Sequence, residues 1–223
     1  MSLENLPDVV REAVEHDHRA VRPLHPAWMR AMVAAAILAV VLAFVLANAS
    51  LRADIETLPM WLSWGCSALQ LVLGILLLGL ALREAVPGSG VPIGTVRLAA
   101  ATALGVQILV GVATSIYSPA IVMPGSGVAP GIGCLKHEAM MALPTFAVTL
   151  LLIFRALPMR APTAGLLGGA GATVASDGVI HLLCPMANLS HVLVWHTGAV
   201  FLFMGLGWMI GVLWERLRWR NSP

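Results

Sequence analysis

The sequence predicts an all-α integral membrane protein, a six-transmembrane-helix bundle preceded by a short cytoplasmic N-terminal amphipathic helix. Of the 223 residues, 59% are apolar and 11% are charged, whereas soluble domains carry about 25% charged residues. The mean hydropathy of +0.88 agrees with this composition. These values exclude a water-soluble enzyme, and we expect a membrane protein that is not an enzyme.

Six apolar runs are each long enough to span a membrane, because about 20 apolar residues cross the hydrocarbon core as a helix. The runs occupy residues 28–49, 60–82, 98–116, 134–154, 163–183 and 193–214. We expect three parts: a cytoplasmic partner-binding segment at 1–27, the transmembrane domain at 28–215 and a basic cytoplasmic tail at 216–223.

Charged residues, prolines and glycines separate these runs and mark the connections between the predicted helices. The breaks lie at 52–56, 87–90, 124–127, 158–162 and 185–190. Pro144 lies inside the fourth run, where it should kink the helix without ending it. Ala47-Asn48-Ala49 resembles a signal-peptide cleavage site, but the segment before it is too long and too acidic for a signal peptide.

Basic residues gather on one side of the predicted membrane. Eleven of the thirteen lysines and arginines lie before or at the start of the first run, after the last run, or between the second and third or the fourth and fifth runs. Only Arg52 and Lys136 fall on the other side. Since cytoplasmic loops carry the excess of Lys and Arg, we expect both termini in the cytoplasm.

Thiol, imidazole and carboxyl groups gather at the outer, periplasmic ends of the predicted helices. Cys134, His137 and Glu138 begin the fourth run, and His191 and His196 lie around the start of the sixth. The i, i+4, i+7 spacing of Asp177, His181 and Cys184 aligns them on one side of the fifth helix. The candidate metal-binding or redox-sensing residues are Cys134, Cys184, His181, Asp177, His137 and His196.

Three interpretations of this group stay open. Thiolate and imidazole ligands suit Zn, Cd or Hg better than Mg or Ca, although no obligate cofactor is expected. In an oxidising compartment the two cysteines could instead close a disulfide. Alternatively, Asp177 and His181 only hold helices together and the cysteines are inert small residues. No CxxC or HExxH spacing identifies a metal site.

Small residues predict where helices touch. Gly165 and Gly169, like Gly207 and Gly211, have the four-residue spacing that lets two backbones approach closely in lipid. We interpret them as packing positions within the chain, with a homo-oligomer seam as the alternative.

The segment before the first run has the pattern of an amphipathic helix. Its apolar face comprises Leu6, Val10, Ala13 and Val14, and its acidic face includes Asp8 and Glu12. Residues 1–19 contain five acids and two arginines, a net charge of 5 − 2 = 3 negative. Anionic lipid headgroups should repel such a segment, so we expect a protein partner with a hydrophobic groove. The alternative is a loosely ordered solubilising tail.

The layout resembles the NrsF-like anti-sigma factors, a family of bacterial inner-membrane proteins. The residues that carry the resemblance are Val21-Arg22-Pro23-Leu24 with Pro26, Ala85-Val86-Pro87-Gly88, Cys134-Leu135, Ala164-Gly165-Leu166 with Gly168 to Gly171, and Cys184-Pro185 followed by Trp195. Their order and spacing along a matching hydropathy profile cover nearly the whole chain.

The resemblance implies a membrane-bound anti-sigma factor in the inner membrane. Such a protein sequesters an extracytoplasmic-function (ECF) sigma factor through its N-terminal segment and contacts lipids but no nucleic acid directly. It releases the sigma factor when Cys134 and Cys184, which match the family's two periplasmic-side cysteines, sense heavy metal or oxidative stress. His137, His196 and Cys66 match no family position.

Two other functions are weighed against this one. A haem- or thiol-dependent redox protein would use His181 and His196 as axial ligands. A small transporter is suggested only by the intramembrane acid Asp177, without the paired broken helices and internal repeat of many secondary transporters.

Overall fold

The computed structural model describes residues 12, 24–117, 128–186 and 188–220, which form helices joined by short connections. The elements are α2 (Ala27–Asn48), η2 (Trp61–Gly65), α3 (Cys66–Glu84), α4 (Ile93–Tyr117), α5 (Val128–Arg155), α6 (Ala161–Leu183), α7 (Leu189–His191), η3 (Val192–His196) and α8 (Thr197–Arg220). Both η2 and η3 are π-helical turns. The predicted residues Leu6, Asp8, Val10, Ala13 and Val14 lie outside the described part, and Glu12 is exposed.

The described residues contain six helices that are long and apolar enough to cross a membrane, so the predicted all-α bundle is confirmed. Several helices extend beyond the predicted runs. α4 begins at Ile93, α5 begins at Val128, and α8 continues to Arg220 through the segment predicted as a tail. The early start of α5 places Cys134 one to two turns inside the helix. α5 also continues through Pro144.

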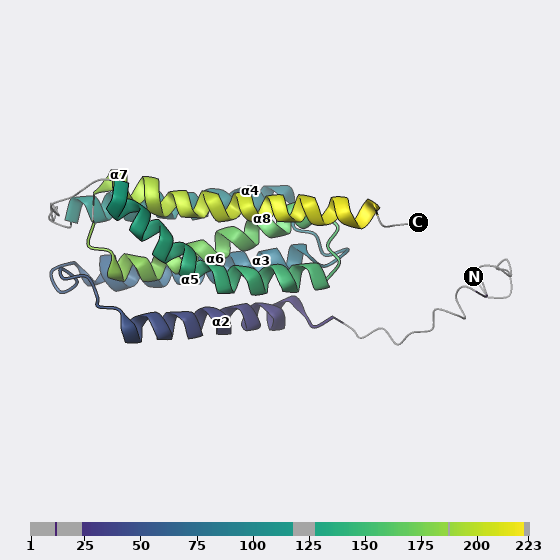
Figure 1. The fold of residues 1–223 in the computed structure, drawn as a ribbon, viewed down its shortest axis with the longest axis horizontal. Helices are drawn as coiled ribbons and strands as arrows, with labels where there is room; N and C mark the ends of the chain where they lie inside the picture. The colour runs from purple at the N-terminus through teal and green to yellow at the C-terminus, as the bar shows by residue number, and fades with distance from the viewer. Residues whose placement is uncertain (1–11, 13–23, 118–127, 187, 221–223) are drawn as a thin grey trace.

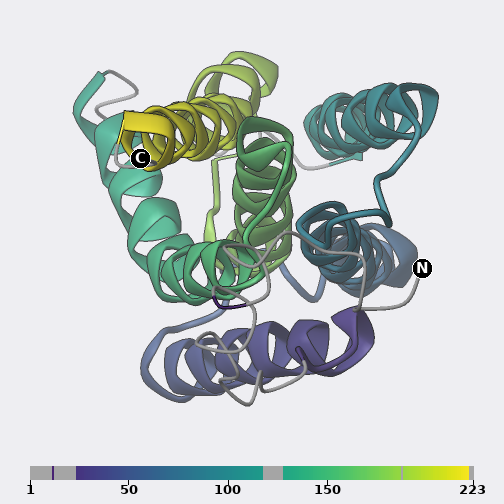
Figure 2. The same cartoon turned by 90° about the vertical axis from the view of Figure 1, so that its right-hand side faces the viewer.

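The central helix of the bundle is α6. In its most apolar stretch of 18 residues, 89% of the residues are buried inside the protein. It contacts α3, α5 and α8, and Figure 2 shows it surrounded by these helices. Glycines allow this position, since Gly165 lies against the backbone of Gly207 and Gly169 against that of Phe203. Dispersion contacts between close backbones replace the hydrophobic effect as the packing force in lipid. The predicted glycine pairs therefore pack within the chain.

Polar contacts join the helix termini at one end of the bundle. The buried Arg30 guanidinium donates to the carbonyl oxygens of Leu82, at 2.7 Å, and Leu152, at 3.1 Å. Arg160 pairs with Glu84 at 2.6 Å. The backbone N–H of Ala161 donates to Glu215 at 2.8 Å. We call this the anchor end; α2 begins there and α8 ends there (Figure 1).

The cluster end, defined as the end where Cys134 and Cys184 lie, is covered by the connection between α2 and η2. Arg52 and Asp54 form a buried ion pair of 2.6 Å in this connection. The backbone N–H of Arg52 donates to the carbonyl of Leu182 at 3.0 Å. The connection is thereby fixed onto the end of α6, directly beside Cys184.

Candidate functional site

Two free thiols from different helices meet at the cluster end. Cys134 is half-buried in α5, and Cys184 is buried immediately after the last residue of α6. Their sulfur atoms lie 3.5 Å apart. The hydrogen bond to Cys134 and burial both raise the pKa of the Cys184 thiol. The pair is close enough for both sulfurs to bind one ion.

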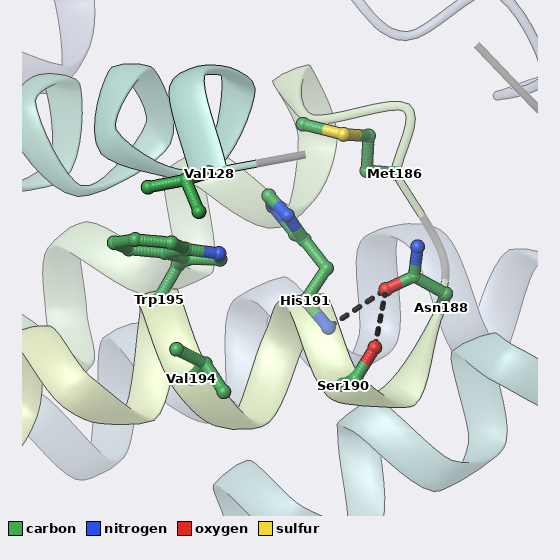
Figure 3. Close-up of a pocket in the computed structure, with 7 residues that line it drawn as sticks. All are labelled: Val128, Met186, Asn188, Ser190, His191, Val194 and Trp195. Atoms are coloured by element: carbon green, nitrogen blue, oxygen red, sulfur yellow. Dashed lines mark hydrogen bonds between the residues drawn. The ribbon is translucent and has the colours of Figure 1, made fainter. Parts of the chain in front are cut away.

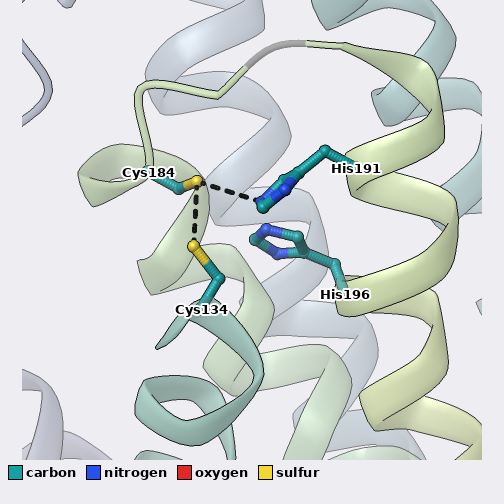
Figure 4. Close-up of side chains that lie close together, drawn as sticks. All are labelled: Cys134, Cys184, His191 and His196. Atoms are coloured by element: carbon teal, nitrogen blue, oxygen red, sulfur yellow. Dashed lines mark hydrogen bonds between the residues drawn. The ribbon is translucent and has the colours of Figure 1, made fainter. Parts of the chain in front are cut away.

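Two imidazoles face the thiols from the start of the last membrane helix. The Nε2 atom of His191 lies 3.6 Å from Cys184 Sγ, and the ring centroids of His191 and His196 are 5.3 Å apart. Figure 4 shows both rings turned toward the two sulfurs. The four ligand atoms of Cys134, Cys184, His191 and His196 all lie within 4.8 Å of one another. We call these residues the four-ligand group.

The π-helical turn η3 brings these two histidines together. Residues five apart on an α-helix point about 140° away from each other, because each residue turns the helix by about 100°. The wider π turn, with hydrogen bonds from i to i+5, returns position i+5 to the same side. η3 spans Val192 to His196 and has His191 as its N-cap. Both imidazoles therefore reach Cys184 from one helix face.

A buried polar network holds the His196 ring in place through its Nδ1 atom. Its Nδ1 donates to the Asp177 carboxylate at 2.6 Å. The Gln70 side-chain amide donates to the other carboxylate oxygen of Asp177 and also to the side-chain carbonyl oxygen of Gln107. With Nδ1 engaged, Nε2 of His196 is the nitrogen left for a metal ion. The network links α3, α4, α6 and η3.

Glu138 is a second buried carboxylate beside the same imidazole. Its nearest oxygen lies 3.6 Å from His196 Nδ1. Neither oxygen accepts a hydrogen bond from the described residues, although the side chain is fully buried. The ligand atoms of Glu138, Asp177 and His196 also lie within 4.8 Å of one another. Among the described residues this is the other group with metal-ligand spacing.

Two predicted site residues lie apart from the four-ligand group. His181 is buried, but its Nε2 donates to the carbonyl of Leu62 in η2 at 2.9 Å. His137 is exposed, with Nδ1 2.8 Å from the carbonyl oxygen of Gly133. The structure instead adds His191 to Cys134, Cys184 and His196. Of the two histidines considered as haem ligands, His181 donates through Nε2 to the Leu62 carbonyl and His196 through Nδ1 to Asp177.

Two cavities reach the group from different directions. A cavity of about 380 Å³ is lined by His191, Asn188 and Ser190 together with four apolar or aromatic side chains, Trp195 among them (Figure 3). A groove of about 700 Å³ between α2, α5 and α6 is lined almost entirely by apolar side chains. Cys134 and Cys184 lie along this groove. The site thus borders the first cavity at His191 and the apolar groove at the thiols.

Sequence reasoning did not select Gln70, Gln107 or His191 as site residues. The glutamines had a detectable signal, because each is a polar amide within an otherwise apolar membrane run, where such groups need internal partners. The spacing of His191 and His196 had none, since five residues do not match an α-helical face.

Comparison with known families identifies the family of this chain. A family model described as NrsF, negative regulator of sigma F, matches residues 15–219. The match includes all six membrane helices and the four-ligand group, and it begins after the predicted apolar face at Leu6 to Val14. Neither curated proteins nor solved structures give a match.

Proposed function

The chain belongs to the NrsF family of negative regulators of sigma F, and we propose that it is a membrane-bound anti-sigma factor. In this proposal it holds an ECF sigma factor at the cytoplasmic face of a bacterial inner membrane. The family match over residues 15–219 is the observation that carries it. The six apolar helices support a multi-pass location.

The orientation proposed for the bundle puts the anchor end in the cytoplasm. The Lys and Arg excess lies at that end of the helices, as the positive-inside rule requires. Cysteine reporters test it in a variant that lacks the native cysteines. Ser190→Cys, exposed at the cluster end, should react with a membrane-impermeant reagent in spheroplasts, and Met159→Cys, exposed near the anchor end, only after permeabilisation. The reverse pattern contradicts the proposed orientation.

We assign sigma-factor capture to the acidic amphipathic segment. Leu6, Val10, Ala13 and Val14 would lie in a groove of the sigma factor, with Asp8 and Glu12 facing basic residues of the partner. This helix-in-groove arrangement suits an amphipathic segment that is too short to form a domain of its own. Deleting residues 1–19 should abolish capture and leave the membrane domain folded.

We assign sensing to the cysteines at the cluster end. A thiophilic ion could bridge Cys134 and Cys184, and an oxidant that accepts two electrons could join them in a disulfide with loss of two protons. Driving a two-state switch from 1:99 to 99:1 needs about 5.5 kcal/mol of differential binding. Structural zinc sites bind with about 10–16 kcal/mol in total, so about a third to a half of this would have to differ between the two states of the switch.

Co-purification tests the function directly. The full-length protein in membranes should retain a sigma factor, and added Cd²⁺ or Zn²⁺ should release it. The variant with both Cys134→Ser and Cys184→Ser should retain the sigma factor in the presence of the metal, whereas Cys66→Ser should behave as the wild type. Absence of any bound sigma factor contradicts the regulatory proposal, and unchanged release from the double variant contradicts the sensing role.

A further inference from the structure

We propose that the four-ligand group is a preorganised tetrahedral site for a divalent ion of the Zn²⁺ type. This inference deepens the proposed sensing role, on which its biological meaning rests. It adds two imidazoles to the two thiols and names a positioning residue, Asp177.

The spacing of the ligand atoms matches a tetrahedral zinc site. Zinc binds sulfur at about 2.3 Å and nitrogen at about 2.0–2.1 Å, so tetrahedral angles separate two sulfurs by about 3.8 Å and sulfur from nitrogen by about 3.6 Å. The Cys134 and Cys184 sulfurs are 3.5 Å apart. Cys184 Sγ and His191 Nε2 are 3.6 Å apart. These two separations match, and the others, all within 4.8 Å, would shorten by at most about 1.5 Å when the ligands close around an ion of this size.

The surroundings of His196 are those of a metal-bound histidine. Such a ring usually donates its other N–H to a carboxylate, which fixes the ring and raises its basicity. Asp177 accepts this hydrogen bond at 2.6 Å and is itself held by Gln70. Asp177 thus acts on the ion through His196 and does not need to touch it.

Charge and burial also favour this occupant. Two thiolates offset the charge of a divalent cation, and the Asp177 carboxylate bonded to His196 adds further negative charge beside it, which lowers the cost of placing the ion among buried groups. Cys184, His191 and His196 are all buried. Four protein ligands leave no open coordination position for a substrate, a pattern typical of structural rather than catalytic zinc.

An ion can reach the four-ligand group through the cavity beside His191. His191 borders the cavity of about 380 Å³ that also contains Asn188 and Ser190. In the proposed orientation this cavity opens toward the periplasm, from which an external metal arrives. His191 is accordingly the first ligand that an incoming ion meets.

Cobalt binding to the purified full-length protein in detergent, without sigma factor, tests the proposal. Co²⁺ replaces Zn²⁺ in tetrahedral sites and gives intense visible bands together with thiolate-to-metal charge transfer. We expect one tightly bound Co²⁺ with these bands, displaced by Zn²⁺. His191→Ala should weaken binding at least about 100-fold, the upper range already seen for loss of an outer-shell partner. His137→Ala, an exposed histidine near the same thiols, is the matched control and should bind as the wild type.

A second variant keeps the test decisive if His191→Ala folds poorly. His191→Cys retains a metal ligand at the position and should restore binding with stronger thiolate charge transfer. Weak bands typical of six-coordinate cobalt, or wild-type affinity and spectra in His191→Ala, would overturn the four-ligand site.

The site and the proposed function can fail separately. A confirmed cobalt site combined with no metal-dependent release of sigma factor refutes the sensing role and leaves the site standing. Release by Zn²⁺ with unchanged sensitivity in His191→Ala shows that sensing does not need His191, which refutes the four-ligand site and leaves the sensing role.

Discussion

Two buried carboxylates beside one imidazole have opposite hydrogen-bond environments. Asp177 accepts from His196 and Gln70, whereas neither oxygen of Glu138 has a partner among the described residues. Hydrogen bonds to a charged group contribute about 1.5–3 kcal/mol each, while an unpartnered buried polar group is destabilising. The two side chains therefore make unequal contributions to stability although they lie close together.

Substitution by the corresponding amides should separate them. We expect Asp177→Asn to lower the free energy of unfolding by about 2–3 kcal/mol, because it weakens two charge-assisted hydrogen bonds. Glu138→Gln should leave it unchanged or raise it, since no hydrogen bond is lost. Thermal unfolding in detergent with a metal chelator measures both. Equal destabilisation by the two variants would contradict this interpretation.

The sequence predicted part of this site because its signals are local. Asp177 and Cys184 lie on or next to one helix at α-helical spacing, and Cys134 and Cys184 lie at the same predicted membrane level. His181 shares that helix face, yet its ring bonds to the Leu62 carbonyl of a neighbouring helix. Which neighbour a polar group meets depends on helix packing, and hydropathy does not specify this.

At the scale of elements, close contact between α6 and α8 depends on glycine. A Cβ atom at Gly165 would overlap the Gly207 carbonyl, while one at Gly205 on α8 would meet no atom within 4 Å. Gly165→Ala should destabilise the protein by about 1–3 kcal/mol through overpacking. Gly205→Ala, the matched control, should be neutral or stabilising by up to about 1 kcal/mol. Unfolding midpoints of the two variants measure the difference, and a neutral Gly165→Ala would show that the helices can separate without cost.

The π turn η3 gives a second prediction at this scale. Deleting Val194, an exposed residue inside η3, should convert the turn to regular α-helix, since a π turn contains one additional residue per turn of helix. His191 and His196 would then be four residues apart, about 40° around the helix, and both imidazoles would stay on one face. The deletion should therefore keep the wild-type cobalt spectrum. Inserting an alanine after Val194 places the two histidines six residues apart, about 120° around an α-helix, and should reproduce the spectrum of His191→Ala. Loss of the cobalt spectrum after deletion of Val194 would contradict this account of the π turn.

The helices themselves were predictable and the π turns were not. Each membrane helix can be predicted from a run of about 20 apolar residues, because that length crosses the hydrocarbon core. A π turn changes the hydrogen-bond register of a few residues without changing hydropathy, as at Val192 to His196. The predicted starts of α4 and α5 were late because the polar or small residues at Ile93 to Arg97 and Val128 to Gly133 are helical despite lower hydropathy.

At the scale of the whole molecule, the proposed sensor and the proposed sigma-binding segment lie at opposite ends of the bundle. α6 has 23 residues and therefore measures about 35 Å. Helix α2 connects the two ends: it lines the groove beside Cys134 and Cys184 with Phe44 and is held at the anchor end by Arg30. In its most apolar stretch of 18 residues only 11% of the residues are buried, the lowest buried fraction among the six membrane helices. α2 is the element that can shift with least disruption of packing.

Thermodynamic linkage makes this coupling measurable from either end. If a bound ion weakens sigma-factor binding by some factor, sigma factor must weaken ion binding by the same factor, typically about 5–150-fold. We expect the Co²⁺ dissociation constant of the full-length protein to rise on saturation with sigma factor, and the sigma-factor dissociation constant to rise equally on saturation with Zn²⁺. Deleting residues 1–19 should make ion affinity independent of sigma factor. Metal-dependent release without a reciprocal change in ion affinity would show that equilibrium ion binding at the four-ligand group does not drive the switch.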